Sequence, residues 1–138
     1  MIETGTDLDC QRIFEVTEGE ARAVEAGDMD AYLSLLSADV VFMPQNVTAK
    51  TGNELREWLR DFLEHFTIKY REFAHGETII RDDLACHTYT CSWIATPKSG
   101  GEAKLMFFKG MHVLRRQSDG SWKIARSLWN TDPAPSQQ

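Results

Sequence analysis

The feature that most constrains the fold is a change in hydrophobic periodicity near Phe66. Before this residue, apolar positions recur every three or four residues, which predicts amphipathic helices. After it, apolar and polar positions alternate in long runs, which predicts strands. A chain of 138 residues can bury one hydrophobic core and leaves little room for a second domain. The order of elements therefore predicts an α+β fold in which helices pack on a sheet.

Three helices and one short strand are predicted before the change in period. The first helix covers residues 7–26 and ends at Gly27, and Asp28 caps a second, shorter helix. Residues 39–44 form the short strand. Thr51 then opens an S/T-x-x-E capping-box pattern. The helix behind it has the strongest amphipathic pattern in the chain, with apolar positions Leu55, Trp58, Leu59, Phe62, Leu63 and Phe66.

Four long strands are predicted after the change in period, joined by turns, at about 67–80, 84–96, 102–117 and 121–131. Short turns between consecutive strands imply an antiparallel meander, and long strands twist and curl. We expect the three helices to pack on the concave face of a strongly curved, mostly antiparallel sheet, an α+β cone with a conical cavity. Residues 1–131 form this single domain and 132–138 a short tail. Such a cavity favours a small-molecule ligand.

Charge and composition exclude several classes of partner. The net charge of −6 argues against nucleic acid and against anionic membrane surfaces. The N-terminus lacks the features of a signal peptide and no apolar run is long enough to span a membrane, so a cytoplasmic location is predicted. Cys10, Cys86 and Cys91 are an odd set, which argues against a disulfide framework and favours buried apolar roles. The four histidines lack metal-ligand spacing, so no metal site is expected.

Short motifs spread along the chain resemble the nuclear-transport-factor-2-like superfamily, also called SnoaL-like or cystatin-like α+β cones. The residues that carry the resemblance are AGDMDA at 26–31, SADVVF at 37–42, Gly52, DGSWKI at 119–124 and LWN at 128–130. They occur in the expected order over nearly the whole chain. The resemblance implies the cone fold and a pocket. It does not choose a function, because this fold hosts isomerases, cyclases, dehydratases and non-catalytic binders.

Comparison with the ketosteroid isomerases of this superfamily argues against their chemistry here. Those enzymes use an aspartate base and an oxyanion hole made of a tyrosine and a protonated acid. On this sequence the position of the base falls on Pro44, which cannot transfer a proton. The positions of the two oxyanion donors fall on Glu20 and His112, and the pocket tryptophan is kept as Trp129. The resemblance therefore supports the pocket and not that reaction.

Glu20 and His112 are the candidate catalytic residues. The resemblance places His112 on a cavity-facing strand side with Phe108, and a histidine there can act as acid, base or donor. Glu20 lies near the edge of the buried stripe of the first helix, and the alternative is a solvated carboxylate. If Glu20 points inward, the two side chains form an acid–base pair across the cavity. Such a pair suits proton abstraction next to a carbonyl, cyclisation or dehydration without a metal or organic cofactor.

The predicted strand 84–96 has one face rich in aromatic side chains and one face of small residues. The family pattern puts the small set, with Thr88 and Thr90, inside the cavity. The aromatic set would then be an exposed stripe, which is typical of an interface and predicts a homodimer through the outer sheet face. The opposite assignment puts an aromatic box in the pocket, and both assignments stay open. The predicted ligand-binding residues are Trp129, Ser127, Phe108, Phe14, Tyr32, Phe42, Trp58, Thr88 and Thr90.

Three functions are compatible with these patterns. The favoured one is a pocket for a hydrophobic small molecule, in a cofactor-free isomerase, cyclase or dehydratase. The second is a non-catalytic ligand carrier with the same cavity, in which Glu20 points to solvent. The third is an interaction module whose cavity is filled by side chains such as Phe42, Phe108 and Trp129.

Overall fold

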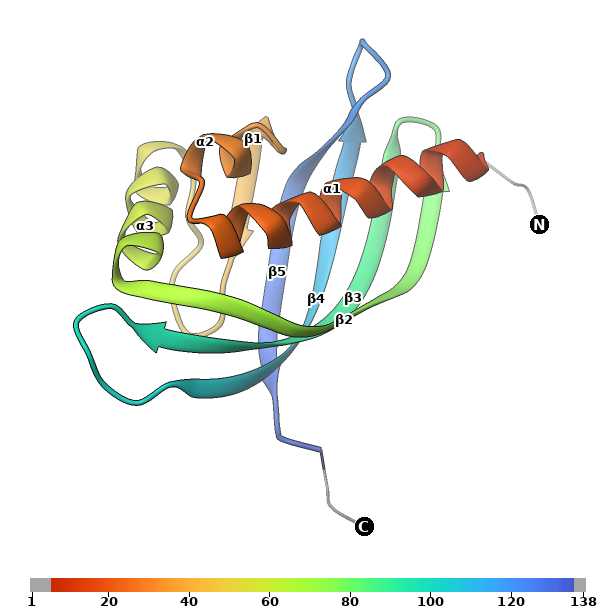
Figure 1. Ribbon diagram of the computed structural model, residues 1–138. Helices are drawn as coiled ribbons and strands as arrows, with labels where there is room; N and C mark the ends of the chain where they lie inside the picture. Colours follow the sequence, from red (N-terminus) through yellow and green to blue (C-terminus); the bar gives the residue numbers. More distant parts are fainter. Residues whose placement is uncertain (1–5, 136–138) are drawn as a thin grey trace.

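The computed structural model describes residues 6–135 (Figure 1). Residues 1–5, where no signal peptide was predicted, and 136–138, the end of the predicted tail, lie outside the described residues. The elements are α1 (Asp7–Ala26), α2 (Met29–Leu33), β1 (Leu36–Met43), α3 (Gly52–His65), β2 (Phe66–Arg81), β3 (Leu84–Pro97), β4 (Lys104–Arg116) and β5 (Trp122–Asp132). The predicted helices and strands are all present, with ends that move by at most three residues.

The helix ends follow local capping chemistry, with one exception. Thr6 and Asp9 form a reciprocal capping box at the start of α1, and Gly27 ends that helix with a left-handed φ of 65°. The capping box predicted at Thr51 is wrong, because its side chain makes no capping hydrogen bond. Gly52 has a φ of 54°, so the chain enters α3 along a different path from a regular capping box.

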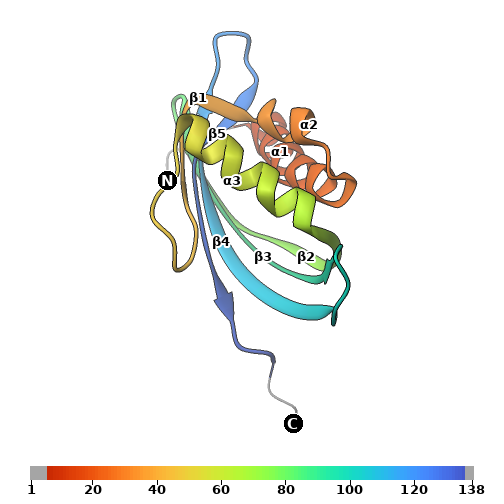
Figure 2. The same cartoon turned by 90° about the vertical axis from the view of Figure 1, so that its left-hand side faces the viewer.

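The sheet has the strand order β1-β5-β4-β3-β2. Strands β2 to β5 form the predicted antiparallel meander, and β1 pairs with β5 in parallel at one edge. The register shifts twice between β2 and β3, at Tyr70/Glu72 and at His75/Thr78, and once between β4 and β5. Such irregularities bend a strand and increase its twist. The sheet accordingly curls around the helices, as Figure 2 shows from the side.

The helices lie on the concave face of this sheet, which confirms the predicted α+β cone (Figures 1 and 2). Helix α1 crosses the sheet, and α2 and α3 lie together toward one end of it. The largest fully buried apolar side chains come from both layers and are Phe42, Ile13, Leu55, Leu114 and Ile124. No helix within residues 6–135 has the length and apolar character needed to cross a bilayer.

An ion pair between Asp9 and Arg116 holds the N-terminal turn of α1 against the C-terminal end of β4. The Arg116 guanidinium donates to both carboxylate oxygens of Asp9, at 2.7 and 3.1 Å. The indole Nε1 of Trp122 donates to the same carboxylate at 3.1 Å. The hydrogen bond from Arg116 is the main reason that the pKa of Asp9 lies far below its usual range. These contacts set the position of α1 along the sheet, and therefore of the residues further along its inner face.

Candidate functional site

A cavity of about 430 Å³ lies between the three helices and the sheet, in the size range of small-molecule sites. Because the space is open, the interaction module with a filled cavity is not supported. Phe108 and Trp129 line the cavity without filling it. Half of the lining residues are aromatic, and the full set is Glu20, Val24, Tyr32, Pro44, Gln45, Asn46, Trp58, Leu59, Phe62, Phe66, Tyr70, Phe73, Tyr89, Cys91, Trp93, Ala95, Met106, Phe108, Trp129 and Thr131.

Among the described residues of this wall, Glu20 is the one that carries a charge. Helix periodicity places it on the inner side of α1, three residues after the buried Thr17. It is only 8% exposed, so the solvated alternative is wrong. The Tyr32 hydroxyl on α2 donates a hydrogen bond to Glu20 Oε2 at 3.0 Å. The corner at Gly27 therefore brings two helices together to hold one carboxylate at the cavity surface.

His112 lies directly beside Glu20 rather than across the cavity from it. Its ring is fully buried and is absent from the cavity wall that residues 6–135 form. Nε2 is 3.3 Å from Glu20 Oε1, without the alignment of a hydrogen bond, and Nδ1 is 3.2 Å from the Thr17 hydroxyl. The arrangement expected from sequence, with His112 facing the cavity and Glu20 opposite it, is therefore wrong. The structure brings the pair together but places the imidazole behind the carboxylate.

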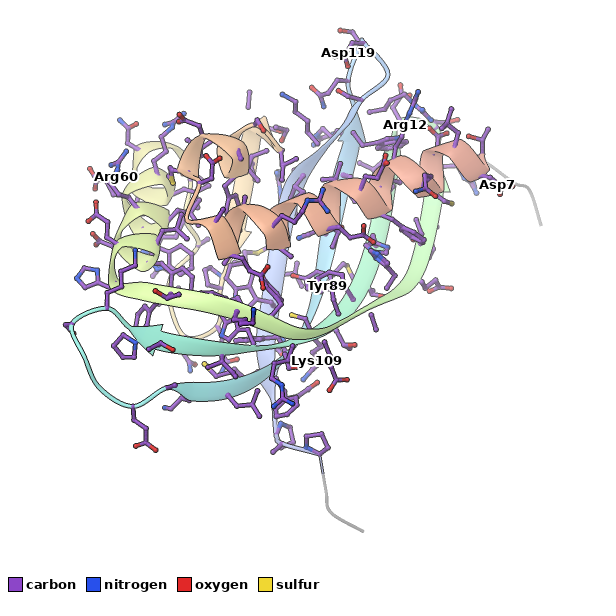
Figure 3. All side chains as sticks on the ribbon, in the orientation of Figure 1. Asp7, Arg12, Arg60, Tyr89, Lys109 and Asp119 are labelled. Atoms are coloured by element: carbon purple, nitrogen blue, oxygen red, sulfur yellow. The ribbon has the colours of Figure 1, made fainter. Side chains whose placement is uncertain are left out.

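The Tyr89 ring packs beside His112 and lines the cavity, whereas His112 does not. Gly110 lies opposite Tyr89 in the β3–β4 ladder, and the tyrosine ring lies across it. A Cβ atom at Gly110 would be 2.5 Å from both Cζ and the hydroxyl oxygen of Tyr89, closer than any side chain tolerates. The Tyr89 ring centroid is 5.0 Å from that of His112. Figure 3 shows Tyr89 on the helix side of the sheet and Lys109, the neighbour of Gly110, on the opposite side.

Burial and the Glu20 charge keep the hydroxyl and thiol groups of the wall protonated. The pKa values of Tyr32, Tyr70 and Tyr89 lie well above the ordinary tyrosine value, first through burial and then through the nearby negative charge. The same two causes raise the pKa of Cys91 to about 12. The three tyrosines are therefore neutral hydrogen-bond donors near neutral pH. The Cys91 thiol is therefore a poor nucleophile near neutral pH, because the reactive species is the thiolate.

The rest of the cavity is an aromatic enclosure built from both layers. Trp58 on α3 has its ring centroid 6.0 Å from that of Trp129 on β5. On the sheet, Trp93 packs against Phe108 with centroids 4.6 Å apart and the two rings steeply inclined to each other. Phe62 on α3 contacts the same Trp93 at 5.7 Å. Helix α3 thus closes the cavity over β3, β4 and β5.

The aromatic face of β3 points into the cavity. Tyr89, Cys91 and Trp93 line it, whereas Thr88 and Thr90 border a shallow hollow on the other side of the sheet. The expectation that the small residues face inward is therefore wrong, and the alternative of an aromatic box is correct. Burying the rings removes far more apolar surface from water than burying threonines. A homodimer through the outer face stays a prediction, now without the exposed aromatic stripe that suggested it.

Three other predicted ligand-binding residues lie outside the wall. Phe14 stacks on His75 with ring centroids 4.2 Å apart. Phe42 is fully buried and supports Trp129 through an edge-to-face contact at 5.6 Å. Ser127 is 1% exposed and pairs with His112 across the β4–β5 ladder. Their positions fit packing behind the cavity, whereas Tyr32, Trp58, Phe108 and Trp129 lie in the wall as predicted.

A second polar cluster lies under α1 beyond Phe14 and was not predicted. The two rings of His75 and His87 are joined by an Nδ1···Nε2 contact of 2.9 Å. Glu18 Oε2 is 2.7 Å from His75 Nε2, and the Thr78 hydroxyl is 2.7 Å from His87 Nδ1. Burial lowers the pKa of His87 to about 4. Within residues 6–135, no group of three or more His, Cys, Asp or Glu side chains is arranged to hold a metal ion.

Two of the cavity residues that were not predicted depend on irregular strand pairing. Tyr70 and Phe73 both face the cavity although an odd spacing puts strand residues on opposite faces. The register shift between Tyr70 and Glu72 accounts for this. The one signal in the sequence was that both residues are aromatic and follow shortly after the strongly amphipathic helix α3, which packs over the same cavity.

A curved sheet covered by helices on its concave face, with an aromatic cavity and one buried carboxylate between the layers, defines the α+β cone class. The model of the SnoaL-like domain matches residues 11–126. The chain belongs to this family.

Solved structures agree on the fold. A ketosteroid isomerase-like protein from Erwinia carotovora is 21% identical with a TM-score of 0.84, over 93% of this chain and all of the other. An NTF2-like superfamily protein from Salmonella enterica is 13% identical with a TM-score of 0.77, over 91% and 92% of the two chains. A protein of unknown function with a cystatin-like fold from Nostoc punctiforme is 18% identical with a TM-score of 0.71, over 96% and 97%. No curated protein matched the chain.

Proposed function

We propose that this protein binds a hydrophobic small molecule in the aromatic cavity and that Glu20 transfers a proton at the polar end of that molecule, without a cofactor. The observation that carries the proposal is the position of Glu20. It is a buried carboxylate at the surface of a ligand-sized cavity, held by the Tyr32 hydroxyl at 3.0 Å. A general base needs this combination of a fixed position and access to the reacting carbon.

The reaction class that suits this arrangement is proton abstraction next to a carbonyl. Glu20 takes the proton as the C–H bond breaks, and the electron pair of that bond moves to form an enolate. The protonated hydroxyls of Tyr70 and Tyr89 face the same cavity and are donors for the enolate oxygen. His112 lies behind Glu20, with Nε2 3.3 Å from Oε1, and is itself held by the Thr17 hydroxyl, so we assign it a positioning role. One relative in fold is described as ketosteroid isomerase-like, but here the proposed base comes from α1, because the position of the isomerase base falls on Pro44.

The test is hydrogen–deuterium exchange of β-tetralone, a bicyclic ketone with acidic protons beside its carbonyl. The ketone is incubated with protein in deuterated buffer, and loss of the α-proton signals is followed by NMR. We expect the wild-type protein to accelerate exchange above buffer and Glu20→Gln to lose that acceleration. Glu15→Gln is the matched control, because Glu15 lies on the same helix but outside the cavity wall that the described residues form.

The outcomes distinguish the cofactor-free enzyme from the non-catalytic ligand carrier. Acceleration that survives Glu20→Gln would refute Glu20 as the base. Binding of β-tetralone without acceleration, seen as quenching of the cavity tryptophans, would instead favour the non-catalytic carrier. Homodimerisation and a cytoplasmic location remain predictions that this assay does not address.

A further inference from the structure

The cavity wall carries a negative charge that binding of a neutral hydrophobic ligand does not require. Among the twenty described residues that line the cavity, Glu20 is the only charged one, and there is no lysine, arginine or histidine. Ten of the others are aromatic. The faces of aromatic rings carry the negative part of the ring quadrupole. The wall therefore combines one full negative charge with many surfaces that attract positive charge.

The negative charge of Glu20 acts across the cavity. It contributes to raising the pKa of Tyr70 on β2 and of both Tyr89 and Cys91 on β3. These strands belong to the sheet layer, and α1 lies over its concave face (Figure 1). A charged group of a ligand anywhere in this half of the cavity would therefore interact with the same field. A cation gains from that interaction, whereas an anion loses.

Glu20 also keeps acceptor capacity for a ligand. One oxygen accepts the Tyr32 hydroxyl at 3.0 Å, and the other has His112 Nε2 at 3.3 Å without hydrogen-bond alignment. A carboxylate offers about four lone-pair directions, so further donors fit. Burying a carboxylate costs free energy, and a cation bound at its remaining lone pairs offsets part of that cost.

We infer that the cavity takes a hydrophobic organic cation, a protonated amine or an iminium ion, with its charged nitrogen at Glu20 and its carbon skeleton against the aromatic rings. Carboxylate contact and cation–π contact then act on the same group. This inference rests on the proposed ligand site and names its ligand class.

The same chemistry gives the proposed proton transfer a physical advantage. When Glu20 removes a proton from the carbon beside an iminium group, the C–H electron pair forms a C=C bond. The C=N π pair moves to nitrogen, and the product is a neutral enamine. Carboxylate and iminium charges disappear together, which a low-dielectric cavity favours. With a ketone, the negative charge only moves from Glu20 to the enolate oxygen.

The experiment compares three ligands with one carbon skeleton and different charge. Binding of β-aminotetralin, β-tetralol and tetralin-β-carboxylate is measured near neutral pH by isothermal titration calorimetry, with wild-type protein, Glu20→Gln and Glu15→Gln. We expect the ammonium to bind at least about tenfold more tightly than the alcohol, and the carboxylate to bind most weakly. Glu20→Gln removes the preference for the amine, and Glu15→Gln keeps it.

Equal affinity of the wild-type protein for the amine and the alcohol would overturn the inference and leave the hydrophobic site standing. A preference for the amine that persists in Glu20→Gln would also overturn it, because the charge would then act elsewhere. No binding of any of the three ligands would refute this inference and the proposed function together. The wild-type comparison needs no variant, so it is decisive even if Glu20→Gln does not fold.

Discussion

Replacing Asp9 by asparagine tests whether one buried carboxylate fixes α1 on the sheet. The side chain of Asp9 is buried and accepts two hydrogen bonds from Arg116 and one from Trp122. The asparagine amide keeps one acceptor oxygen but presents an NH₂ group to a guanidinium that can only donate. Hydrogen bonds to charged groups contribute about 1.5–3 kcal/mol each. We expect a loss of about 2–3 kcal/mol in the free energy of unfolding, and a melting temperature lower by roughly 6–12 °C.

The pH dependence of this loss identifies its cause. Because the folded state lowers the pKa of Asp9, its contribution to stability is fully present above the unfolded value of 3.8. It is lost as the pH falls below that value toward the folded pKa. Urea denaturation of wild type and Asp9→Asn from neutral pH down to the acid limit of folding should therefore show a stability difference that shrinks below about pH 4.

Asp83→Asn is the matched control for this experiment. Asp83 bonds the same guanidinium through Arg116 Nε at 3.0 Å, but its side chain is 78% exposed. An exposed ion pair of this kind contributes less than about 1 kcal/mol. A difference for Asp9→Asn that stays constant with pH, or that equals the difference for Asp83→Asn, would refute the electrostatic explanation.

Three further predictions concern the residues around the cavity. Gly110→Ala should displace the Tyr89 ring and cost about 1–3 kcal/mol of stability. Gly19→Ala is the control, because a Cβ there would lie at an ordinary contact distance of 3.5 Å from Leu35, and it should leave ligand binding unchanged. Denaturation and β-tetralone binding measure both variants, and unaltered binding by Gly110→Ala would contradict the close contact. His87 should stay neutral down to about pH 4, and an NMR titration of the imidazole with a midpoint near 6.5 would contradict its burial. The Cys91 thiol, with its pKa raised to about 12, should react with iodoacetamide far more slowly at about pH 8 than a free thiol does, which mass spectrometry of the modified peptides measures; rapid modification at Cys91 would be the opposing result.

The architecture could be predicted because it depends on local patterns. The helical stripe that ends at Gly27 and the alternation after Phe66 are patterns of neighbouring residues, and the observed helices and strands follow them closely. The failed capping box at Thr51 shows the limit of such patterns. Its residues match the motif, but the left-handed backbone at Gly52 changes how the chain enters the helix.

The site was predicted less completely because it depends on which strand faces meet the helices. Alternation shows that β3 has two unlike faces but not which one is inside, and the positions of Tyr89 and Trp93 in the wall decide it. Register shifts are also invisible in the sequence, and one of them brings Tyr70 and Phe73 to the same cavity. The sequence put Glu20 at the edge of the buried stripe of α1. At that position a small rotation of the helix determines whether the carboxylate faces solvent or the cavity.

The most direct test of the account is the ratio of β-tetralone exchange rates between wild-type protein and Glu20→Gln under identical conditions. A positioned general base contributes about a hundredfold or more, so a ratio of that order is expected, with Glu15→Gln equal to wild type. A ratio of one, with wild-type protein still accelerating exchange above buffer, would contradict the central role given to the buried carboxylate.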